Sequence, residues 1–525
     1  MSQSSDWKHG YFADNGYTFG YYREMAPCYL AWAALLQGVI VPTRNFRYID
    51  LGCGQGLGLI LQAACHPESE FVGVDFMPAH VAHARRLAQA AGITNVRFIE
   101  GDFTALENDA SALADAAGAP LEGQTDYVVA HGIASWVSPT VRASLWALAG
   151  RLLKPGGLHY TSYNTEPGWL AAKPFQHLVM LRQAQGRTGA QALRSGMDTL
   201  AALEAAKSKL YATFTTLKPR MEVAASQDIA YLTQEYNNRH WEPLRVSDMM
   251  AQAAAVKLDW VGSATLPEQF GNLLPPEMAK LIDSESDPAL RETVRDLAVV
   301  QSFRRDLYVK GSTVAWPSER LERVSQTRVV ASHLLPLPEG SDGKMEIATT
   351  LGKVRVNREA CQAILTCAGE QGATIAQLQQ GAGQSESLGS MAQKASLLMH
   401  AGLLYLQHDT DANARELNCA LAQAVCDGAP YKYLAAPRLG EATGLDGLNA
   451  MLYVACADDE QAGNPTPVLA HVLRHLAQLR QRVQLSLQVE GRDETGGPVF
   501  EAELEKRARS YIETQWPTLK RLQMA

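Results

Sequence analysis

The sequence predicts an α/β protein built on a doubly wound, Rossmann-like parallel sheet. Between residues 46 and 164, short apolar runs alternate with segments of helical periodicity. Such alternation is typical of a parallel sheet, which binds its ligands at the carboxyl ends of its strands. The strands that we expect here are 46–51, 70–76, 96–103, 126–132 and 158–164. The helices that we expect between them are 58–66, 78–92 and 139–157.

A helical insertion interrupts this alternation at about residues 168–225. Between Lys173 and Arg220 it carries eight Lys and Arg residues against two acidic residues. This basic surface is either a solvated helix face or a surface that steers an acidic partner. The α/β pattern then resumes with a helix at 246–258 and strands at 259–266 and 303–312. We therefore expect one sheet domain, insertion included, at 1–312.

Two smaller domains are expected after the sheet, because 525 residues suggest about three domains. A Pro-rich linker precedes a hairpin-like alternation at 344–357, and short helices follow it. This order predicts a winged-helix-like middle domain at 340–410. A C-terminal domain of helical and mixed structure is expected at 411–525. Because the middle domain is not conspicuously basic, we expect it to contact protein rather than DNA.

The composition limits which kinds of partner and which cellular compartment we expect for this protein. The chain is 46% hydrophobic and 19% charged with a net charge of −8, so we expect no nucleic-acid partner and no attraction to anionic lipid. The N-terminus shows no signal-peptide pattern, and the longest apolar stretch, 29–41, is too short to span a bilayer. We expect a cytoplasmic protein without membrane insertion. Eight scattered cysteines without a CxxC pair predict neither a disulfide framework nor a metal site.

The glycine-rich stretch "YIDLGCGQGLG" at 48–58 predicts a cofactor loop. A nicotinamide loop needs G-x-G-x-x-G, but the third required glycine falls on leucine in every register, and no Lys-Ser or Lys-Thr follows for a phosphate loop. Asp50, two residues before Gly52, would repel a pyrophosphate. S-adenosylmethionine (SAM) carries cationic groups instead, so the loop with Gly52, Gly54 and Gly56 favours a methyl donor.

Two more acidic residues end predicted strands and fit the same cofactor. Asp75 lies at the distance from the glycines that suits both ribose hydroxyls. Asp102 can accept from the adenine amino group, with Phe103 on one side of the ring and Phe76 and Met77 on the other. The alternative is that each strand-ending Asp only caps the following helix. Together the three acids predict a class I SAM-dependent methyltransferase.

The methyl acceptor is less constrained. Methyl transfer mainly requires a positioned neutral nucleophile and exclusion of water. The Asn/Asp-Pro-Pro-aromatic motif of amide and adenine methylases is replaced by "HGIASWVSP" after the fourth strand, which disfavours that class. His131 and Gly132 end this strand, where we expect them beside the reacting methyl group.

Several longer motifs extend this pattern, and with them the chain resembles a known family. The motifs are "GYTFGYYREMAP", "IDLGCGQG", "VGVDFMPAHV", "HGIASWVSP", "SYNTEPGW", "AYLTQEYNNRHWEPLRVSDMM", "DWVGSATL" and "DPALRETVRDLAVVQSFRRDLYVKG". They span about residues 15–312 and resemble the bacterial protein-lysine methyltransferases of the type that modifies rickettsial outer-membrane proteins, which carry a methyltransferase regulatory domain. Residues after 312 match more loosely.

The resemblance implies N-methylation of lysine in a protein substrate, and homodimers to which the helical insertion contributes. It also marks two departures, since the family usually has an aromatic residue at the position of Ala134 and an apolar one at that of Glu166. Both positions are expected to face the acceptor. Glu166 would then attract a lysine ammonium group, unless it only solvates the turn.

The remaining site expectations concern residues around the reacting centre. Tyr17 and Tyr21 precede the sheet in a segment that would cover the methionine end of SAM, or they only pack there. Tyr163 and Asn164, at the end of the fifth strand, would receive or orient the amine, with His131 as a further catalytic candidate. The two tryptophans expected near the substrate are Trp136, which is equally expected in the core, and Trp169.

Other functions stay open at this point. A small-molecule methyltransferase would use the later domains as lid or dimer elements. A regulatory SAM-binding module would sense the cofactor and contact partners. Because every cofactor motif precedes residue 140, we expect residues 313–525 to be dispensable for SAM binding.

Overall fold

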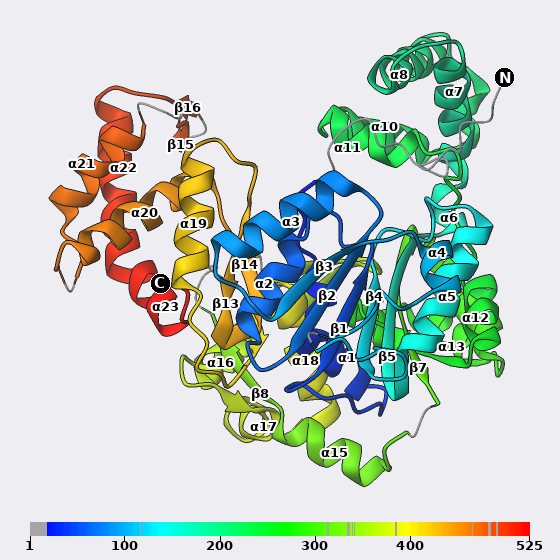
Figure 1. Ribbon diagram of the computed structural model, residues 1–525, viewed down its shortest axis with the longest axis horizontal. Coiled ribbons are helices and arrows are strands. Elements are labelled where there is room, and N and C mark those ends of the chain that lie inside the picture. The colour runs from blue at the N-terminus through cyan, green and yellow to red at the C-terminus, as the bar shows by residue number, and fades with distance from the viewer. Residues whose placement is uncertain are drawn as a thin grey trace.

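A seven-stranded sheet forms the centre of the computed structural model, which describes residues 18–525 except 116, 312–313, 333–336, 339, 341, 384–385, 465, 481–484 and 490–491 (Figure 1). The strand order is β3-β2-β1-β4-β5-β7-β6. The strands are β1 (Arg47–Leu51), β2 (Glu70–Asp75), β3 (Val96–Glu100), β4 (Thr125–Ala130), β5 (Leu153–Asn164), β6 (Leu258–Ser263) and β7 (Phe303–Lys310). Each of the seven strands predicted for this domain is confirmed.

The directions and the order of the strands produce the ligand-binding crevice that is typical of a doubly wound fold. β1 to β5 pair in parallel, and β7 lies antiparallel between β5 and β6. The strand order reverses between β1 and β4, and sheets of this kind bind ligands outside the carboxyl ends of strands at such a point. The antiparallel β7 is a feature that the alternation of the sequence did not indicate.

Two apolar cores cover the two faces of the sheet, because successive strand residues point to opposite faces. Tyr48 and Tyr127 belong to one core, whereas Ile49 and Val128 belong to the other. The helices on the first face are α1 (Pro27–Leu35), α2 (Leu57–Cys65) and α3 (Pro78–Ala90). Those on the second are α4 (Phe103–Asn108), α5 (Pro139–Leu152) and α12 (Val246–Ala255).

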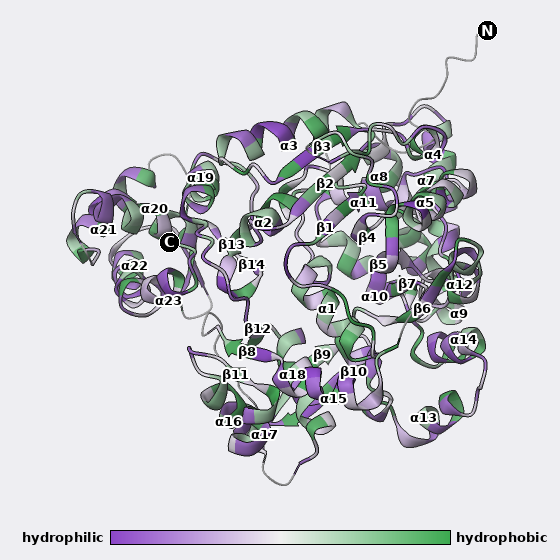
Figure 2. Cartoon of the chain, turned by 60° about the horizontal axis from the view of Figure 1, so that its bottom comes forward, coloured by the Kyte–Doolittle hydropathy of each residue, from purple (hydrophilic) through white to green (hydrophobic). Residues whose placement is uncertain are grey.

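Two further helices, α13 (Pro276–Asp283) and α14 (Pro288–Val299), connect β6 to β7. Outer helices such as α3 and α13 mix hydrophilic residues, drawn purple in Figure 2, with apolar ones. The short 3-10 helices are η1 (Arg23–Met25), η2 (Leu170–Ala172), η3 (Leu266–Gln269), η4 (Gly271–Leu273) and η5 (Pro437–Leu439).

The helical insertion leaves the sheet after β5 and has an apolar core of its own, which includes Phe175, Leu193 and Tyr236. Its helices are α6 (Glu166–Trp169), α7 (Lys173–Ala184), α8 (Gly189–Ala205), α9 (Lys209–Thr213), α10 (Leu217–Ala225) and α11 (Ile229–Tyr236), and they project at the upper right of Figure 1. Thr165 and Leu244 pair in a parallel bridge at its base. The two ends of the insertion therefore lie side by side.

The middle part of the chain forms a small sheet with four helices. The strands β8 (Arg328–Ala331), β11 (Ala373–Thr374) and β12 (Leu404–Leu406) pair in the order β11-β8-β12, and β9 (Lys344–Thr349) forms the predicted hairpin with β10 (Gly352–Asn357). The helices are α15 (Pro317–Gln326), α16 (Arg358–Ala368), α17 (Ile375–Ala382) and α18 (Leu388–His400). Because β8 is the central strand, this unit begins before residue 340. The winged-helix assignment stays a prediction.

The C-terminal part is helical with two hairpins. Its helices are α19 (Arg415–Cys426), α20 (Gly447–Gln461), α21 (Leu469–Leu479), α22 (Pro498–Ser510) and α23 (Trp516–Arg521), the last two joined by a π-helical turn at Tyr511–Gln515. Its strands are β13 (Tyr433–Ala436), β14 (Glu441–Gly444), β15 (Leu487–Val489) and β16 (Arg492–Glu494). β13 and β14 pack against α2, the helix that follows the glycine loop (Figure 1).

Arg23, just before α1, ties the sheet domain to both later parts. Its guanidinium forms an ion pair with the buried Glu441, donates to the carbonyl oxygens of Met399 and Leu404, and lies over the Tyr405 ring with 4.1 Å to its centroid. The expectation that residues 313–525 are dispensable for cofactor binding does not fit this packing, because one apolar core runs through all three parts.

Among the described residues, no helix combines the length and apolar character that crossing a bilayer requires.

We predict that the Arg23–Glu441 pair contributes strongly to stability. Arg23→Met leaves an uncompensated buried carboxylate, so the free energy of unfolding should fall by about 3–5 kcal/mol. The double variant Arg23→Met/Glu441→Gln should lose less than the sum of the single variants. Calorimetric unfolding measures both. The control Arg509→Met breaks an exposed pair with Glu505 and should change stability by at most about 0.5 kcal/mol. Equal losses at the two sites would contradict the assignment.

Candidate functional site

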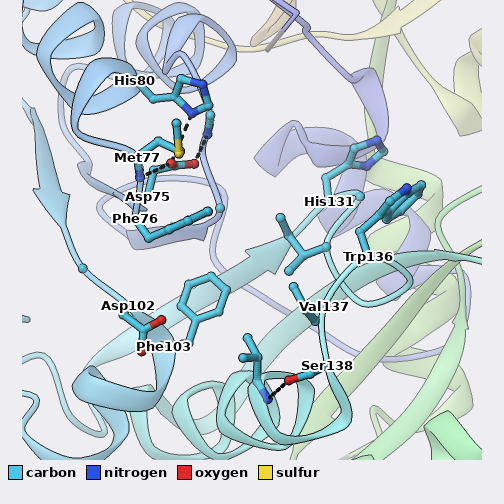
Figure 3. Close-up of a pocket in the computed structure, with 16 residues that line it drawn as sticks. Asp75, Phe76, Met77, His80, Asp102, Phe103, His131, Trp136, Val137 and Ser138 are labelled. Carbon is cyan, nitrogen blue, oxygen red and sulfur yellow. Dashed lines mark hydrogen bonds and ion pairs between the residues drawn. The ribbon is translucent and has the colours of Figure 1, made fainter. Parts of the chain in front are cut away.

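Two neighbouring cavities lie at the carboxyl ends of β1, β2, β3 and β4. The first is lined by residues from the ends of these strands and the start of α5, among them Asp75, Asp102 and Trp136 (Figure 3). The second contains Asp50 and the segment before α1. Gly52, Gly54 and His131 line both cavities, so an elongated ligand can occupy one and extend into the other.

The glycine loop follows β1 so closely that side chains are excluded from it. The backbone N–H groups of Gly52 and Cys53 donate to the Val74 carbonyl oxygen over 2.8 and 3.0 Å. Gly52 has φ +92°, and a Cβ atom there would come within 2.4 Å of the Ile133 side chain. Glycine is therefore required at this position both for its conformation and for its packing.

Asp75, the last residue of β2, holds the loop to the neighbouring strand. Its Oδ2 atom accepts from the Gly54 N–H over 2.9 Å, and its Oδ1 atom accepts from the Met77 N–H over 2.9 Å. His80 Nδ1 lies 3.2 Å from the same Oδ1 atom, as Figure 3 shows. The carboxylate lines the first cavity, where each oxygen has a second lone pair for the two hydroxyls of a ribose.

Asp50 lies buried beside the second cavity with its Oδ1 atom lacking any hydrogen-bond partner. Desolvation, followed by the nearby Asp75 carboxylate, raises its pKa to about 8. An unpaired buried carboxyl group costs free energy unless a ligand pairs with it. The ammonium group of SAM would supply that partner, so this residue fits the expected cofactor.

Asp102 combines a helix cap, one of the two roles that the sequence left open, with a position on the first cavity. Its Oδ1 atom caps α4 by accepting from the N–H groups of Thr104 and Ala105, over 2.9 and 3.0 Å. The residue also lines the first cavity together with Phe103, Phe76 and Met77. Figure 3 shows Phe76 beside Met77 at the end of β2 and Phe103 at the start of α4, with His131 and Trp136 in another part of the lining. These apolar side chains suit a flat aromatic base.

His131 stands where the two cavities meet. Its Nδ1 atom lies 2.8 Å from the Tyr160 hydroxyl and 3.1 Å from the Ser162 hydroxyl, and Ser162 also accepts from the Gly132 N–H. Burial, followed by the charge of Arg305, lowers the pKa of His131 well below its ordinary value. A neutral imidazole of such low basicity is a poor proton acceptor. His131 is therefore better suited to lining the cavity and positioning the ligand than to acting as a catalytic base.

An aromatic group around His131 was missed by the sequence reasoning. Tyr22 stacks on its ring with centroids 3.7 Å apart, and Phe303 meets it edge-on at 5.9 Å. Tyr160 lies parallel to it at 6.0 Å. Phe303 is part of a motif that carries the family resemblance. Tyr22 is adjacent to Tyr21, which the sequence predicted for the cofactor site. Only the fold brings them together.

The two tyrosines expected to cover the methionine end of SAM have different outcomes. Tyr21 lines the second cavity, but its hydroxyl accepts from the Ala442 N–H over 2.9 Å and so contacts the C-terminal part. Tyr17 lies outside the described residues.

Tyr163 and Asn164 do not receive the acceptor, which corrects the expectation for the end of β5. The fully buried Tyr163 belongs to the second core, and its hydroxyl donates to Asp306 over 2.5 Å. Asn164 donates from Nδ2 to the buried Glu235 over 2.8 Å. The antiparallel β7 lies beside β5 in the sheet, and its Asp306 side chain occupies the position next to the Tyr163 hydroxyl where we expected the amine.

Three of the four expected substrate residues also lie elsewhere. Ala134 is buried in the second core. Glu166 pairs with Arg245 over 2.5 Å on the surface, and so is already neutralised. Trp169 packs in the insertion, where the guanidinium carbon of Arg220 lies 3.9 Å from its ring centroid. Trp136 does line the first cavity (Figure 3).

Comparisons with known proteins agree with this arrangement. A model described as "Methyltransferase domain" matches residues 42–227, and one described as "Predicted methyltransferase regulatory domain" matches residues 228–310. An uncharacterized protein of Synechocystis sp. is 30% identical over 466 residues, which are 86% of this chain and 88% of that protein. An uncharacterized protein of Rickettsia prowazekii is 26% identical over 286 residues, which are 54% and 49% of the two chains.

A solved structure is similar over nearly the whole chain. PKMT2 from Rickettsia typhi, solved in complex with AdoHcy, has a TM-score of 0.69 and 17% sequence identity, and the match covers 97% of this chain and 99% of that one. This likeness shows a shared fold. The segment matched as regulatory, 228–310, supplies β6 and β7 and thus completes the sheet.

We predict that Asp50 makes SAM binding depend on pH. With a pKa of about 8 the carboxyl group is mostly protonated at pH 6, whereas the cationic ligand binds the ionised form. The dissociation constant should therefore fall by up to about tenfold per pH unit between pH 6 and 7.5. Calorimetric titration measures it. Asp50→Asn should bind more weakly with a flat profile. A wild-type affinity that is constant over this range, or an unchanged slope in the variant, would refute the assignment.

We predict that Asp75→Ala weakens SAM binding by about 2–4 kcal/mol, because ribose hydrogen bonds at charge-assisted strength are lost and the Gly54 N–H loses its acceptor. The matched control is Glu100→Gln, which changes an exposed carboxylate at the end of β3. It should leave the affinity within about twofold, a difference well below 1 kcal/mol. Wild-type affinity in Asp75→Ala would remove the ribose assignment.

Proposed function

Because the chain belongs to the class I SAM-dependent methyltransferases that carry a methyltransferase regulatory domain, we propose that it methylates the ε-nitrogen of lysine in a protein substrate. The observation that carries the proposal is the aromatic group around His131, the residue that lines both cavities. Tyr22, which lines the second cavity, stacks on the His131 ring, while the half-buried Phe303 and the buried Tyr160 pack against the same ring. Aromatic faces attract cationic alkylammonium groups, which is the form of the methylated product.

The charges beside this group favour an amine over a carboxylate. Arg305 lies with its guanidinium carbon 4.9 Å from the Phe303 ring centroid and pairs with Glu24 over 3.4 Å. The Glu24 carboxylate partly neutralises the charge of Arg305 and so weakens its attraction for an anionic metabolite. Its charge contributes to the low pKa of His131, and it would act in the same direction on a lysine ammonium group, easing loss of the proton.

The residues of this site have separable roles in the proposed reaction. SAM supplies an electrophilic methyl group on a positively charged sulfur. Asp50 would bind the ammonium group of the cofactor and Asp75 its ribose hydroxyls, and His131 and Tyr22, which line the junction of the cavities, would exclude water from it. A neutral lysine Nε then forms the new N–C bond while the S–C bond breaks and its electrons remain on sulfur. The proton that the amine carried is released to solvent.

The likeness to the Rickettsia typhi structure supports the proposal without deciding the acceptor. It extends over the whole chain, so the later parts are shared along with the sheet. AdoHcy, present in that structure, is the form of SAM that remains after the methyl group has left. We further propose that the protein acts as a homodimer in the cytoplasm, as the family resemblance implies.

We predict that protein incubated with SAM labelled at the methyl group transfers label into the protein fraction of a lysate. Mass spectrometry of the labelled peptides should place the methyl group on lysine Nε. Label in small molecules would replace the proposal with a small-molecule methyltransferase. Absence of transfer, with SAM binding intact, would support a regulatory SAM-binding module.

The matched variants in this assay are Phe303→Leu and Phe214→Leu, the second being in the helical insertion. Loss of the aromatic face at Phe303 should lower turnover about tenfold, while the affinity for SAM stays within about twofold. Phe214→Leu should leave both unchanged. Equal turnover in the two variants would contradict a role for the aromatic group.

A further inference from the structure

A second cluster of chemically reactive side chains lies away from the cofactor site, where three parts of the chain meet. Cys28 on α1, His66 at the end of α2 and His408 shortly after β12 are all buried, and their ligand-type atoms lie within 4.8 Å of one another. Cys28 and His408 are 380 residues apart in the chain. The methyl-transfer reaction uses none of these residues.

The nitrogen atoms of this cluster are incompletely satisfied. His66 Nδ1 and His408 Nε2 are buried without a hydrogen-bond partner. His66 Nε2 lies 3.3 Å from the Gly440 carbonyl oxygen, which can only accept, so Nε2 carries the ring proton and Nδ1 presents a lone pair. A backbone carbonyl that receives the outer N–H is the usual support of a metal-binding histidine.

The local backbone keeps the cluster compact. Gly440, which follows η5, has φ +60°, and a Cβ atom on it would come within 2.7 Å of Cys28 Sγ. His408 Nδ1 lies 3.9 Å from the same sulfur. Only glycine permits this approach, so the hairpin of the C-terminal part is held directly against the thiol.

Glu68 provides a carboxylate at the edge of the cluster. It acts electrostatically on both Cys28 and His408, and its Oε1 atom is buried without a hydrogen-bond partner. The Nε atom of Arg44 lies 4.0 Å from that oxygen. Turning this oxygen toward the cluster would break no hydrogen bond of its own.

We propose that Cys28, His66 and His408 bind a Zn²⁺ ion, with Glu68 as the fourth ligand. One thiolate, two neutral imidazoles and one carboxylate are a donor set that zinc accepts in tetrahedral geometry, at about 2.0 Å for nitrogen and about 2.3 Å for sulfur. The ligand atoms must move closer by about 1 Å to reach these distances. Binding releases the Cys28 thiol proton to solvent.

The expected role is structural. A zinc ion here would join α1 and α2 to the segment that enters the C-terminal part, and so hold the sheet against its later neighbours. The cysteine spacing predicted no metal site, because ligands drawn from such distant segments leave no linear motif.

The test uses the full-length protein, freed of metal with a chelator and titrated with Co²⁺ as the probe. We expect one Co²⁺ per chain, with the intense visible bands of a tetrahedral site and a sulfur-to-cobalt charge-transfer band. Cys28→Ser should abolish the charge-transfer band, and His408→Ala should weaken Co²⁺ binding at least about tenfold. The control is Cys65→Ser, which removes a neighbouring buried thiol that donates to the Glu441 carbonyl oxygen over 3.3 Å and should bind normally.

A second measurement covers variants that fail to fold. Stoichiometric Zn²⁺ added to the metal-free wild type should raise the unfolding temperature by several degrees, as expected for a ligand that binds only the folded state. Absence of tetrahedral Co²⁺ bands in the wild type, or no change in unfolding temperature with Zn²⁺, would overturn the proposal. So would a charge-transfer band that persists in Cys28→Ser.

Discussion

The Asp75 carboxylate is the interaction on which the candidate site depends. It closes the gap between two parallel strands by accepting from the Gly54 and Met77 backbone and by contacting His80. No tight turn joins parallel strands, and here the loop after β1 is held to β2 both by backbone hydrogen bonds to Val74 and by this carboxylate. With the glycine loop held in this way, its N–H groups, the Asp50 carboxyl and the His131 ring meet at one point. The same oxygens that shape the loop then face the cofactor.

A second dependence runs from the reaction centre to the C-terminal part. Tyr21 and Tyr22 are consecutive, yet the first accepts from the Ala442 backbone and the second stacks on His131. Arg23 follows them and pairs with Glu441 in the same strand. Tyr21 and Arg23 therefore attach to β14, while Tyr22 between them contacts the reaction centre. Movement of the β13–β14 hairpin cannot leave the aromatic group unaffected.

The fold and the donor half of the site could be predicted because their signals are local in sequence. A strand, a glycine turn and an acidic residue at the end of the next strand identify β1, the cofactor loop and β2 from the sequence. In the structure Asp50, Asp75 and Trp136 line the two cavities. The residues predicted to contact the methyl acceptor lie elsewhere in the structure, for a different reason. Tyr163 was assigned to the acceptor because it lies near a strand end. Its side chain is instead part of the second core, and Asp306 of the neighbouring strand β7 accepts from its hydroxyl. Tyr22 and Phe303 come from opposite ends of the domain, so no short motif contains both.

The base of the helical insertion has an evolutionary consequence. Its first and last residues are joined by backbone hydrogen bonds, from Leu244 N–H to the Asn164 carbonyl oxygen over 2.8 Å and from Glu166 N–H to that of Leu244 over 3.0 Å. A segment with adjoining ends can be lengthened, shortened or exchanged at small entropic cost, and the sheet beneath it keeps its register. The insertion also has its own apolar core, so it can change without reshaping the cofactor loop. Recombination could therefore diversify this module among descendants that retain one chemistry, and a chimera made at Thr165 and Leu244 would use the same boundary.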